Sequence, residues 1–437
     1  MSTESAADRA DELRVTPLEL FFDLVFVFTV TQLTDSLAHH LTPGGMTRVV
    51  VMLAIIWWMY DAFIWLANAM PPKTHSRRGL HLLGMGAFLV IALTVPHAFE
   101  GDGWAFGWAY LVVVLLHTGM FAATGVPAGS VARMGAFNLA GAGLILVGGY
   151  LSASAQLALW VAAFAWTFAN PYLVNLPTFR IEPRHFVERH GLVVIVAFGE
   201  SVIAIGVGAG NAHLSFPLLS AALLCLVVCF GLWWAYFGHD DDEAAADFMT
   251  GLDDARRNHL GVRIYNFGHY LLLLGVLLAA TGAKSAVAHP TDALGTAQAV
   301  ALAGGVALFL AANLAIRRTV GRQPLLPRTC GVLLVLLAIP LGTEGAAQAE
   351  LLALVLVLAG VFGYEEYTAG TLRDRLSVGA AVSPVIVPPV VDSAVAESRE
   401  TEPREMGPRV TEPRGADSRV AESGVAESRV GGVPEPE

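Results

Sequence analysis

Long apolar runs recur along the whole chain, and they restrict its fold more than any other feature. The hydrocarbon core of a bilayer, about 30 Å thick, is crossed by about 20 helical residues. Inside that core every backbone polar group must be bonded within the protein, so helices are expected. The composition agrees, because only 14% of the residues are charged, against about 25% in soluble domains. The chain is therefore predicted to be an all-α, polytopic transmembrane helix bundle.

Twelve apolar segments can be drawn, which predicts about twelve membrane-spanning helices. The eleventh segment is short and contains Pro340, and proline interrupts helices. The segments are 18–37, 47–69, 79–98, 104–124, 133–150, 156–175, 189–209, 216–238, 261–282, 294–316, 329–343 and 347–367.

Lysine and arginine residues are concentrated in alternate connections between these segments. Cytoplasmic connections carry such an excess, so an even number of helices and two cytoplasmic termini are predicted. The other connections hold only Arg48 and Lys284. The basic connections hold Arg9, Arg14, Lys73, Arg77, Arg78, Arg133, Arg180, Arg184, Arg189, Arg256, Arg257, Arg263, Arg317, Arg318, Arg322, Arg328, Arg373 and Arg375.

The composition divides the chain into three parts. Residues 1–17 form an N-terminal segment, residues 18–370 the transmembrane domain, and residues 371–437 a tail that is rich in Pro, Glu, Ser and Arg. The tail repeats Val-Ala-Glu-Ser and Thr-Glu-Pro-Arg, and such a composition cannot bury an apolar core. The tail is therefore predicted to be disordered and cytoplasmic.

The transmembrane domain shows signs of an internal repeat. Its second and eighth segments carry Trp57-Trp58-Met59-Tyr60 and Trp233-Trp234-Ala235-Tyr236, and a glutamate opens both the first and the seventh helix. Two parallel six-helix halves, about 18–180 and 181–370, are therefore predicted, an architecture known from transporters. The alternative is that Trp and Tyr gather at membrane interfaces without a duplication.

Glu200 is the first candidate functional residue, because it lies within the seventh apolar run. Its position about eleven residues into that run corresponds to about 16 Å of helix, which is close to the membrane midplane. A charge there costs about 2.5–3.5 kcal/mol, so a retained carboxyl group needs a reason. Its neighbour Ser201 can donate a hydrogen bond, and a buried carboxyl group can bind and release a proton. The alternative is a structural glutamate that is hydrogen-bonded to a neighbouring helix.

Glu19 and Asp23 are the second candidates, because they lie one helical turn apart on one face of the first helix. Two like charges at this spacing repel each other, so a cation, a shared proton or an arginine is expected beside them. The alternative is an interfacial pair that cytoplasmic arginines hold.

His117, His269 and Asp61 are secondary candidates. The histidines lack the paired spacing of metal ligands, so interhelical hydrogen bonds are favoured over a haem or metal site. Asp61 is expected at the cytoplasmic surface. The acidic loop 239–243 lacks the spacing and the glycine of a calcium loop and is expected to be exposed to solvent. No cofactor and no metal are predicted.

Two stretches of this sequence carry a resemblance to a known family. Residues 16–26 and residues 188–201, which run from Glu188-Arg189-His190-Gly191 to Phe198-Gly199-Glu200-Ser201, resemble the two signatures of the bacterial low temperature requirement A family. His269-Tyr270-Leu271 also fits, and the resemblance covers about residues 14–370. It implies a membrane protein of a family that is named for growth in the cold, and it adds Glu188 and His190 to the candidate site. Phe198 departs from the family pattern, in which an aliphatic residue is expected.

These features favour a secondary transporter or permease of the bacterial plasma membrane, proton-coupled through a buried carboxyl group. Its partners would be the lipid bilayer and a small solute or ion; a homo-oligomer stays open, and no basic stripe suits nucleic acid. Two alternatives are a membrane-embedded enzyme that acts on lipids and a non-catalytic sensor or scaffold whose output is the tail. The sequence has no phosphate loop and no nucleophile elbow, which counts weakly against an enzyme.

Overall fold

The computed structural model describes residues 15–173, 181–239 and 241–382. Of the predicted N-terminal segment 1–17 and the predicted disordered tail 371–437, residues 1–14 and 383–437 lie outside these ranges. Residues 371–382 of that tail are helical, so the ordered part extends beyond the predicted boundary. The described part consists of helices and their connections and contains no strand. The prediction of an all-α helix bundle is therefore confirmed.

The long helices match the predicted segments one for one. Eleven segments of the described chain are long and apolar enough to cross a membrane, and Ala153–Ala169 is a shorter apolar helix. The chain is thus a multi-pass membrane protein. Its elements are α2 (Pro17–His39), α3 (Pro43–Ala69), α4 (His75–Thr94), η1 (Val95–His97), α5 (Gly103–Ala122), α6 (Ala128–Gly148), α7 (Ala153–Leu173), α8 (Pro183–Ala209), α9 (Phe216–Phe237), α10 (Asp241–Thr250), α11 (Asp254–Gly261), η2 (Val262–Gly268), α12 (His269–Ala288), α13 (Thr296–Thr319), α14 (Leu326–Leu336), η3 (Leu341–Gly345) and α15 (Ala347–Val382).

Apart from α15, which extends to Val382, two places differ from the predicted segments. The eleventh span is broken: α14 ends at Leu336, and the π-helical turn η3 follows Pro340, whose missing N–H cannot continue the helix. Between the eighth and ninth spans, the short helices α10 and α11 replace the predicted loop. Three acidic residues stand in the first turn of α10, where the helix dipole favours them.

Several helices begin at a Ser or Thr cap that is closely followed by proline. Thr16, Thr42 and Ser215 accept a hydrogen bond from a backbone N–H in the first turn of α2, α3 and α9, and each of these helices has proline at its first or second position. The cap satisfies a free N–H, and proline is pre-set for the first helical turn. These local signals explain why the predicted starts agree with the structure within a few residues.

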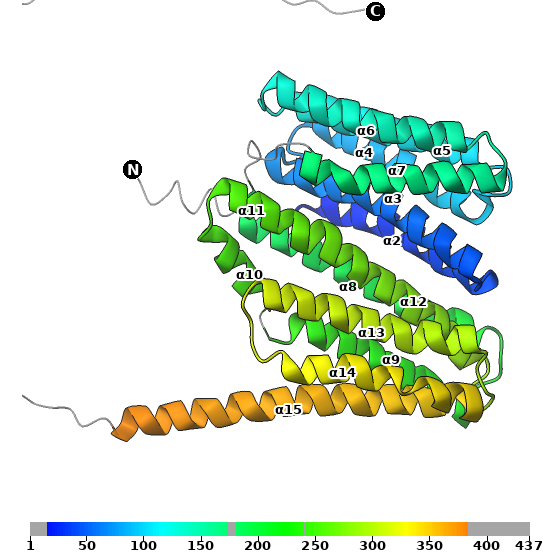
Figure 1. Cartoon of the computed structure of the whole chain (residues 1–437), viewed down its shortest axis with the longest axis vertical. Coiled ribbons are helices and arrows are strands. Elements are labelled where there is room, and N and C mark those ends of the chain that lie inside the picture. The colour runs from blue at the N-terminus through cyan, green and yellow to red at the C-terminus, as the bar shows by residue number, and fades with distance from the viewer. Residues whose placement is uncertain (1–14, 174–180, 240, 383–437) are drawn as a thin grey trace, which may run out of the picture. The chain divides into compact units, whose positions relative to one another are not determined.

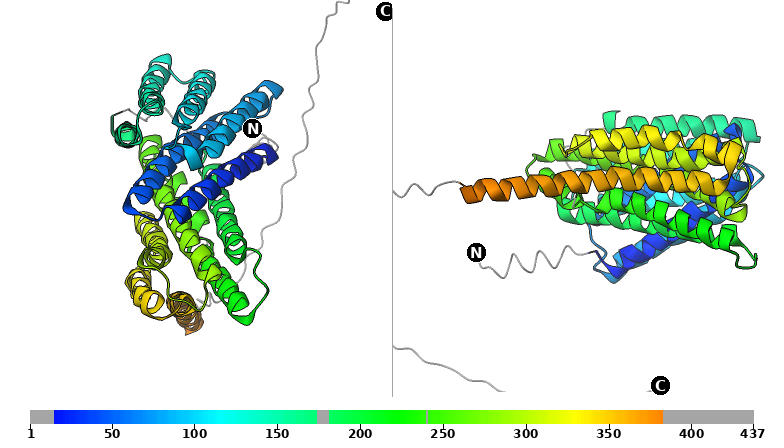
Figure 2. Two further views of the ribbon diagram at one scale, coloured as in Figure 1. Left: turned by 90° about the vertical axis from the view of Figure 1, so that its right-hand side faces the viewer. Right: turned by 90° about the horizontal axis from the view of Figure 1, so that it is seen from below.

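Consecutive spans run antiparallel (Figure 1). We call the side of the bundle on which α2 begins and α3 ends the N-terminal side. Viewed along the helices, α4 to α7 lie on one flank and α9, α13, α14 and α15 on the other, with α2, α3, α8 and α12 between them (Figure 2). Direct packing of α2 and α3 on α8 and α12 joins the two predicted halves.

The same pairs of spans pack in each half. The first half has the contacts α2–α3, α2–α4, α3–α5, α4–α5 and α5–α6. The second half has the corresponding contacts α8–α9, α8–α12, α9–α13, α12–α13 and α13–α14. This recurrence agrees with two parallel six-helix halves, and the duplication itself stays a prediction.

Candidate functional site

Buried ionisable side chains gather where α2 and α3 of the first half meet α8 and α12 of the second half. They lie toward the N-terminal side, close to the start of α2 and α8 and the end of α3. Ionisable groups inside a membrane bundle are costly and mark functional candidates. We call this set the central network; its members are Glu19, Asp23, Tyr60, Asp61, His185, Arg189, His190 and His269, all of them buried.

Arg189 holds the carboxylate of Asp23 in a two-point contact. Its Nη1 and Nη2 atoms lie 2.8 Å from Asp23 Oδ2 and Oδ1, and the hydroxyl of Tyr60 also donates to Asp23. Asp23 and Arg189 are 0% and 1% exposed. Bidentate pairs of this kind are among the strongest hydrogen-bonded contacts, and this one joins α2 to α8. The repulsion between Glu19 and Asp23 predicted a cation, a shared proton or an arginine beside them, and the structure places Arg189 there.

Glu19 also has a structural role at the start of α2. Its Oε2 accepts hydrogen bonds from the backbone N–H and the hydroxyl of Thr16, each at 2.8 Å. This is a capping box, which the sequence Thr-Pro-Leu-Glu encodes. Glu19 Oε1 lies 3.5 Å from His185 Nε2 and 3.9 Å from Arg189 Nε, beyond the distance of a good hydrogen bond. One oxygen of Glu19 therefore caps the helix, and the other faces the central network.

Asp61 and His190 form a buried pair between α3 and α8. The expectation of a surface position for Asp61 is wrong: it is 0% exposed, because α8 and η2 pack against α3. His190 Nδ1 lies 2.8 Å from Phe186 O; a carbonyl only accepts, so Nδ1 carries a hydrogen. His190 Nε2 lies 2.8 Å from Asp61 Oδ1. Two bare acceptors would repel at this distance, so one proton lies between these two atoms.

His269 connects the central network to α9. Its Nδ1 donates to Ile264 O at 3.0 Å, and its Nε2 accepts from the Tyr236 hydroxyl at 2.8 Å. Ile264 belongs to the π-helical stretch η2, and π-helical turns are frequent at functional sites. The rings of His190 and His269 meet edge to face, with centroids 5.2 Å apart. The interhelical hydrogen bond predicted for His269 is therefore present.

Glu200 lies ten residues after His190 on α8, which is about 15 Å along the helix. It is buried, and the Thr31 hydroxyl of α2 donates to its Oε2. Farther from the N-terminal side, Lys284 Nζ of α12 lies 2.6 Å from Asp35 Oδ1 of α2. The contact between α2 and α8 thus carries a second polar group, separate from the central network.

An apolar layer fills the contact between these two polar regions. Phe26 and Val30 of α2 follow Asp23, and Val193, Val194 and Ala197 of α8 lie between His190 and Glu200. All five side chains are buried. Glu200 and the central network are therefore isolated from each other in this conformation.

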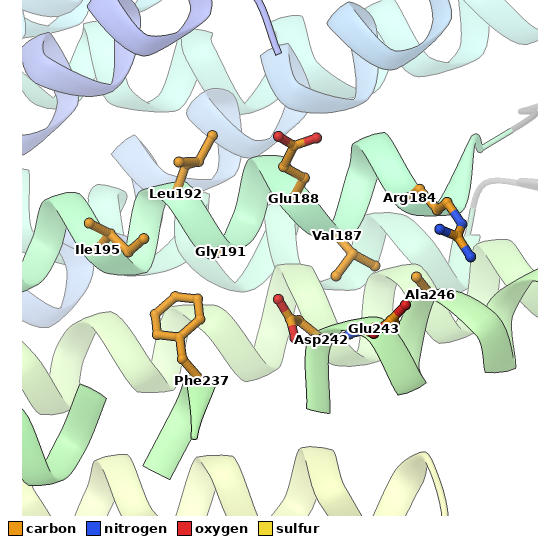
Figure 3. Close-up of a pocket in the computed structure, with 10 residues that line it drawn as sticks. All are labelled: Arg184, Val187, Glu188, Gly191, Leu192, Ile195, Phe237, Asp242, Glu243 and Ala246. Atoms are coloured by element: carbon orange, nitrogen blue, oxygen red, sulfur yellow. Dashed lines mark hydrogen bonds between the residues drawn. The ribbon is translucent and has the colours of Figure 1, made fainter. Parts of the chain in front are cut away.

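Ser201 and Glu188 do not join either polar region. Ser201 lines a small pocket with Cys225 and Cys229 of α9, while Glu200 contacts α2. Glu188 is exposed and lines an open pocket of about 440 Å³ between α8, α9 and α10 (Figure 3). Neighbouring residues of one helix point in different directions, so the four predicted candidates on α8, His190, Glu200, Ser201 and Glu188, lie in four different surroundings.

His117 also stands apart from the central network. It is buried on α5 and packs between the rings of Phe63 and Phe121, with centroid distances of 5.8 and 5.3 Å. The ring also lies beside the backbone of Ala62 on α3, and the interhelical hydrogen bond predicted for His117 stays a prediction. Among the residues that the structure describes, no three His, Cys, Asp or Glu side chains are placed to hold a metal ion.

A second buried set of charges, which the sequence did not single out, lies within the second half. Arg328 of α14 contacts both carboxylate oxygens of Glu365 on α15, at 3.0–3.2 Å. Its Nη1 donates to Ala235 O at 2.8 Å and to Asn313 Oδ1. We call Arg328, Glu365 and Asn313 the peripheral network. It links α9, α13, α14 and α15 on the N-terminal side.

Within the predicted acidic loop 239–243, the described residues differ in exposure, from the buried Asp241 to the exposed Glu243. Asp241 is 9% exposed and accepts hydrogen bonds from Arg317 and, at 2.9 Å, from Arg322 Nε. The expectation of an exposed loop is therefore wrong for Asp241. The acidic run and the basic end of α13 are both visible in the sequence, but their meeting depends on how α10 packs.

Comparisons with known proteins agree with the membrane fold. The model of the bacterial low temperature requirement A protein family matches residues 14–363. The chain is 28% identical over 382 residues to an uncharacterized protein of Rhizobium meliloti (strain 1021), covering 82% of this chain and 90% of that protein. No solved structure matches the chain. Because the family model spans most of the sequence, including α2, α8 and the central network, this chain belongs to the bacterial low temperature requirement A family.

Proposed function

We propose that this protein is a proton-coupled secondary transporter, in which buried groups on and beside α8 bind and release the coupling proton. The observation that carries the proposal is the Asp61–His190 pair, whose geometry requires one shared proton inside the contact between the two predicted halves. A ligand shifts a conformational equilibrium when it binds one state better than the other. A proton bound between Asp61 and His190 would shift the equilibrium in this way, because the contact between α3 and α8 requires that proton.

The consequence of deprotonation follows from the hydrogen bonds. Without the shared proton, the Asp61 carboxylate would face the lone pair of His190 Nε2 at 2.8 Å. Both groups are buried, so water could not relieve the repulsion. Loss of the proton would therefore favour separation of α3 from α8, and protonation would favour the contact.

Glu200 would be the second proton-binding group on the same helix. It faces Thr31 of α2 and lies on the opposite side of the apolar layer from His190. Movement of α8 against α2 would connect first one group and then the other with water. Alternation of two halves around buried sites is the general mechanism of secondary transporters.

The proposed setting is the bacterial plasma membrane, with the N-terminal side in the cytoplasm. Basic residues of the described connections, such as Lys73, Arg133 and Arg256, lie on that side, as cytoplasmic connections require. The transported species would be a small solute or ion.

The experiment is a proton-flux measurement on proteoliposomes that contain the purified protein and an internal pH dye, under an imposed membrane potential. We expect flux above that of empty liposomes for the wild type and loss of that flux in Glu200→Gln. Glu188→Gln is the matched control, since it makes the same change at an exposed position of α8 and should retain the flux. Equal flux in all three proteins, or none above empty liposomes, contradicts proton coupling through Glu200.

A further inference from the structure

Glu350, in the first turn of α15, is a fully buried carboxyl group without a well-formed hydrogen bond. It is 0% exposed, and neither of its oxygens has a well-formed hydrogen bond within the described part of the chain. The backbone N–H that faces it is that of Ala303, which lies inside α13 and is used by that helix. The backbone N–H groups around it are used elsewhere: Ala347 and Gln348 donate to Asp292 O and Pro290 O, and the N–H of Glu350 itself donates to Ala346 O. The helix start therefore leaves the carboxyl group without a donor.

The carboxyl group rests directly on a glycine of the broken eleventh span. A Cβ atom at Gly342 would lie 1.8 Å from Glu350 Oε2, so no other residue fits there without displacing the carboxyl group. Gly342 belongs to the turn η3, and its carbonyl accepts a hydrogen bond from Leu294 N at 2.8 Å. Glu350 thus closes the contact between α15 and η3, on the side of the bundle opposite to the N-terminal side.

Among the residues that the structure describes, no charged side chain is paired with Glu350. In η3 the ionisable residue is Glu344, which is exposed. In the connection before α13, His289 and Asp292 are exposed and lie 3.7 Å from each other. On α13 the residue beside it is Ala303, which is apolar and buried. On α15 itself, the neighbouring Gln348 amide donates to Pro217 O and to the Ser220 hydroxyl of α9.

The first half carries a neutral counterpart. Gln156 is the fourth residue of α7, as Glu350 is the fourth residue of α15, and it also packs against a glycine: a Cβ atom at Gly103 would lie 2.5 Å from Gln156 Nε2. Gln156 Nε2 donates to Ala98 O at 2.7 Å. The amide of Gln156 has a hydrogen-bond partner, whereas a carboxylate at the same place in the second half would have only the N–H of Ala303, which α13 already uses. An unpaired buried charge is far more costly than the neutral form of the same group.

We propose that Glu350 is a proton-binding site that is occupied in this conformation, and that release of its proton requires the contact between α15 and η3 to open. The proton is the ligand: with it, the carboxyl group is neutral and packs on Gly342; without it, the carboxylate needs water. The exchange adds or removes one proton and forms or breaks no other covalent bond. This inference does not depend on the transport proposal, because it concerns the state of Glu350 in the resting protein.

The protonation state can be read directly by infrared spectroscopy of the purified protein at neutral pH. The difference spectrum of wild type minus Glu350→Gln should contain the C=O stretch of a protonated carboxylic acid. Glu344→Gln is the matched control, because its carboxyl group is exposed and should contribute carboxylate bands only. Gln156→Glu should add a second acid band. A difference spectrum of wild type minus Glu350→Gln that contains carboxylate bands and no acid band overturns the proposal.

The coupled opening can be read by hydrogen exchange of Leu341–Gly345 and the first turn of α15. If opening releases one proton, the equilibrium constant for opening in the wild type should increase by up to about tenfold for each unit of pH increase. The reference is the equilibrium constant of Glu350→Gln, measured at the same pH. Comparison at equal pH removes the intrinsic pH dependence of exchange. Identical pH profiles in the two proteins would separate Glu350 from any opening of this contact. Gly342→Ala should weaken protection at every pH, and the glutamine variant supplies the test if the alanine variant does not fold.

Discussion

The central and peripheral networks contain the same chemistry and differ in how completely it is satisfied. Each has a fully buried arginine beside a carboxylate on the N-terminal side. In the peripheral network all three guanidinium nitrogens of Arg328 are hydrogen-bonded, and both oxygens of Glu365 accept. In the central network Arg189 Nε has no partner at hydrogen-bond distance, and Asp61 and His190 need a proton for their contact.

The position of each network matches this difference. The peripheral network lies within one flank, between α9, α13, α14 and α15, whereas the central network joins α2 and α3 to α8 and α12. A fully satisfied polar network rigidifies its surroundings. An incompletely satisfied one can exist in more than one arrangement. The comparison teaches that burial of charged side chains alone does not identify a functional site. The better indicator is a buried charged group whose donors or acceptors lack hydrogen-bond partners.

The largest effect is expected from Arg328→Gln. Removal of one partner from a buried ion pair typically costs about 3–5 kcal/mol, and here Glu365 would be left buried without its cation. The measurement is the free energy of unfolding in mixed detergent micelles. A variant that keeps wild-type stability and loses only proton flux would contradict the structural role of the peripheral network.

Arg189→Gln should destabilise less, by about 3 kcal/mol at the lower end of the same range. Asp23 keeps the hydrogen bond from Tyr60, and a buried carboxylate can be neutralised by a proton. Adding Asp23→Asn should recover part of the loss, so a double-mutant cycle should give a coupling energy clearly above zero. Additive losses would show that the two side chains act independently.

Tyr60→Phe sharpens the comparison, because it removes one hydrogen bond to a charged acceptor without removing a charge. We expect a loss of about 1.5–3 kcal/mol, with the Asp23–Arg189 contact intact. The readout is the same unfolding measurement. Equal stability of wild type and variant would mean that the Tyr60 hydroxyl adds nothing to the pair.

Asp61→Asn should give the smallest loss of stability and a complete loss of proton flux. The asparagine amide can donate to His190 Nε2, so the hydrogen bond persists and the change should stay within about 1 kcal/mol. The pair can no longer lose its proton, so flux in proteoliposomes should stop. Unchanged flux would remove the Asp61–His190 pair from the proposed path.

Much of the fold was predictable because its determinants are local. The apolar runs, the Ser and Thr caps and the interrupting Pro340 are all visible in the sequence, and the structure has helices at each of the twelve predicted segments. The need for a cation beside Glu19 and Asp23 was predicted from their spacing on one helix face. Its identity as Arg189 was not, because that residue lies 166 positions from Asp23.

One wrong prediction and one residue that was not predicted have a common cause. Asp61 was expected at the surface because it follows two tryptophans near a helix end, yet α8 and η2 cover it. The sequence around Glu350 did not indicate a buried carboxyl group, since a glutamate in the first turn of a helix is normally exposed and is stabilised there by the helix dipole. In both cases a neighbouring helix, distant in sequence, removed the water that the local pattern implied.

The sequence by itself determined the number and order of the apolar helices, because a bilayer demands about 20 apolar residues in each helix and that demand is met within one segment at a time. Only the tertiary structure decided which charged groups meet. Glu188 and Arg189 are adjacent in the chain, yet one is exposed and the other is 1% exposed, because a helix turns by about 100° per residue and packing covers a single face.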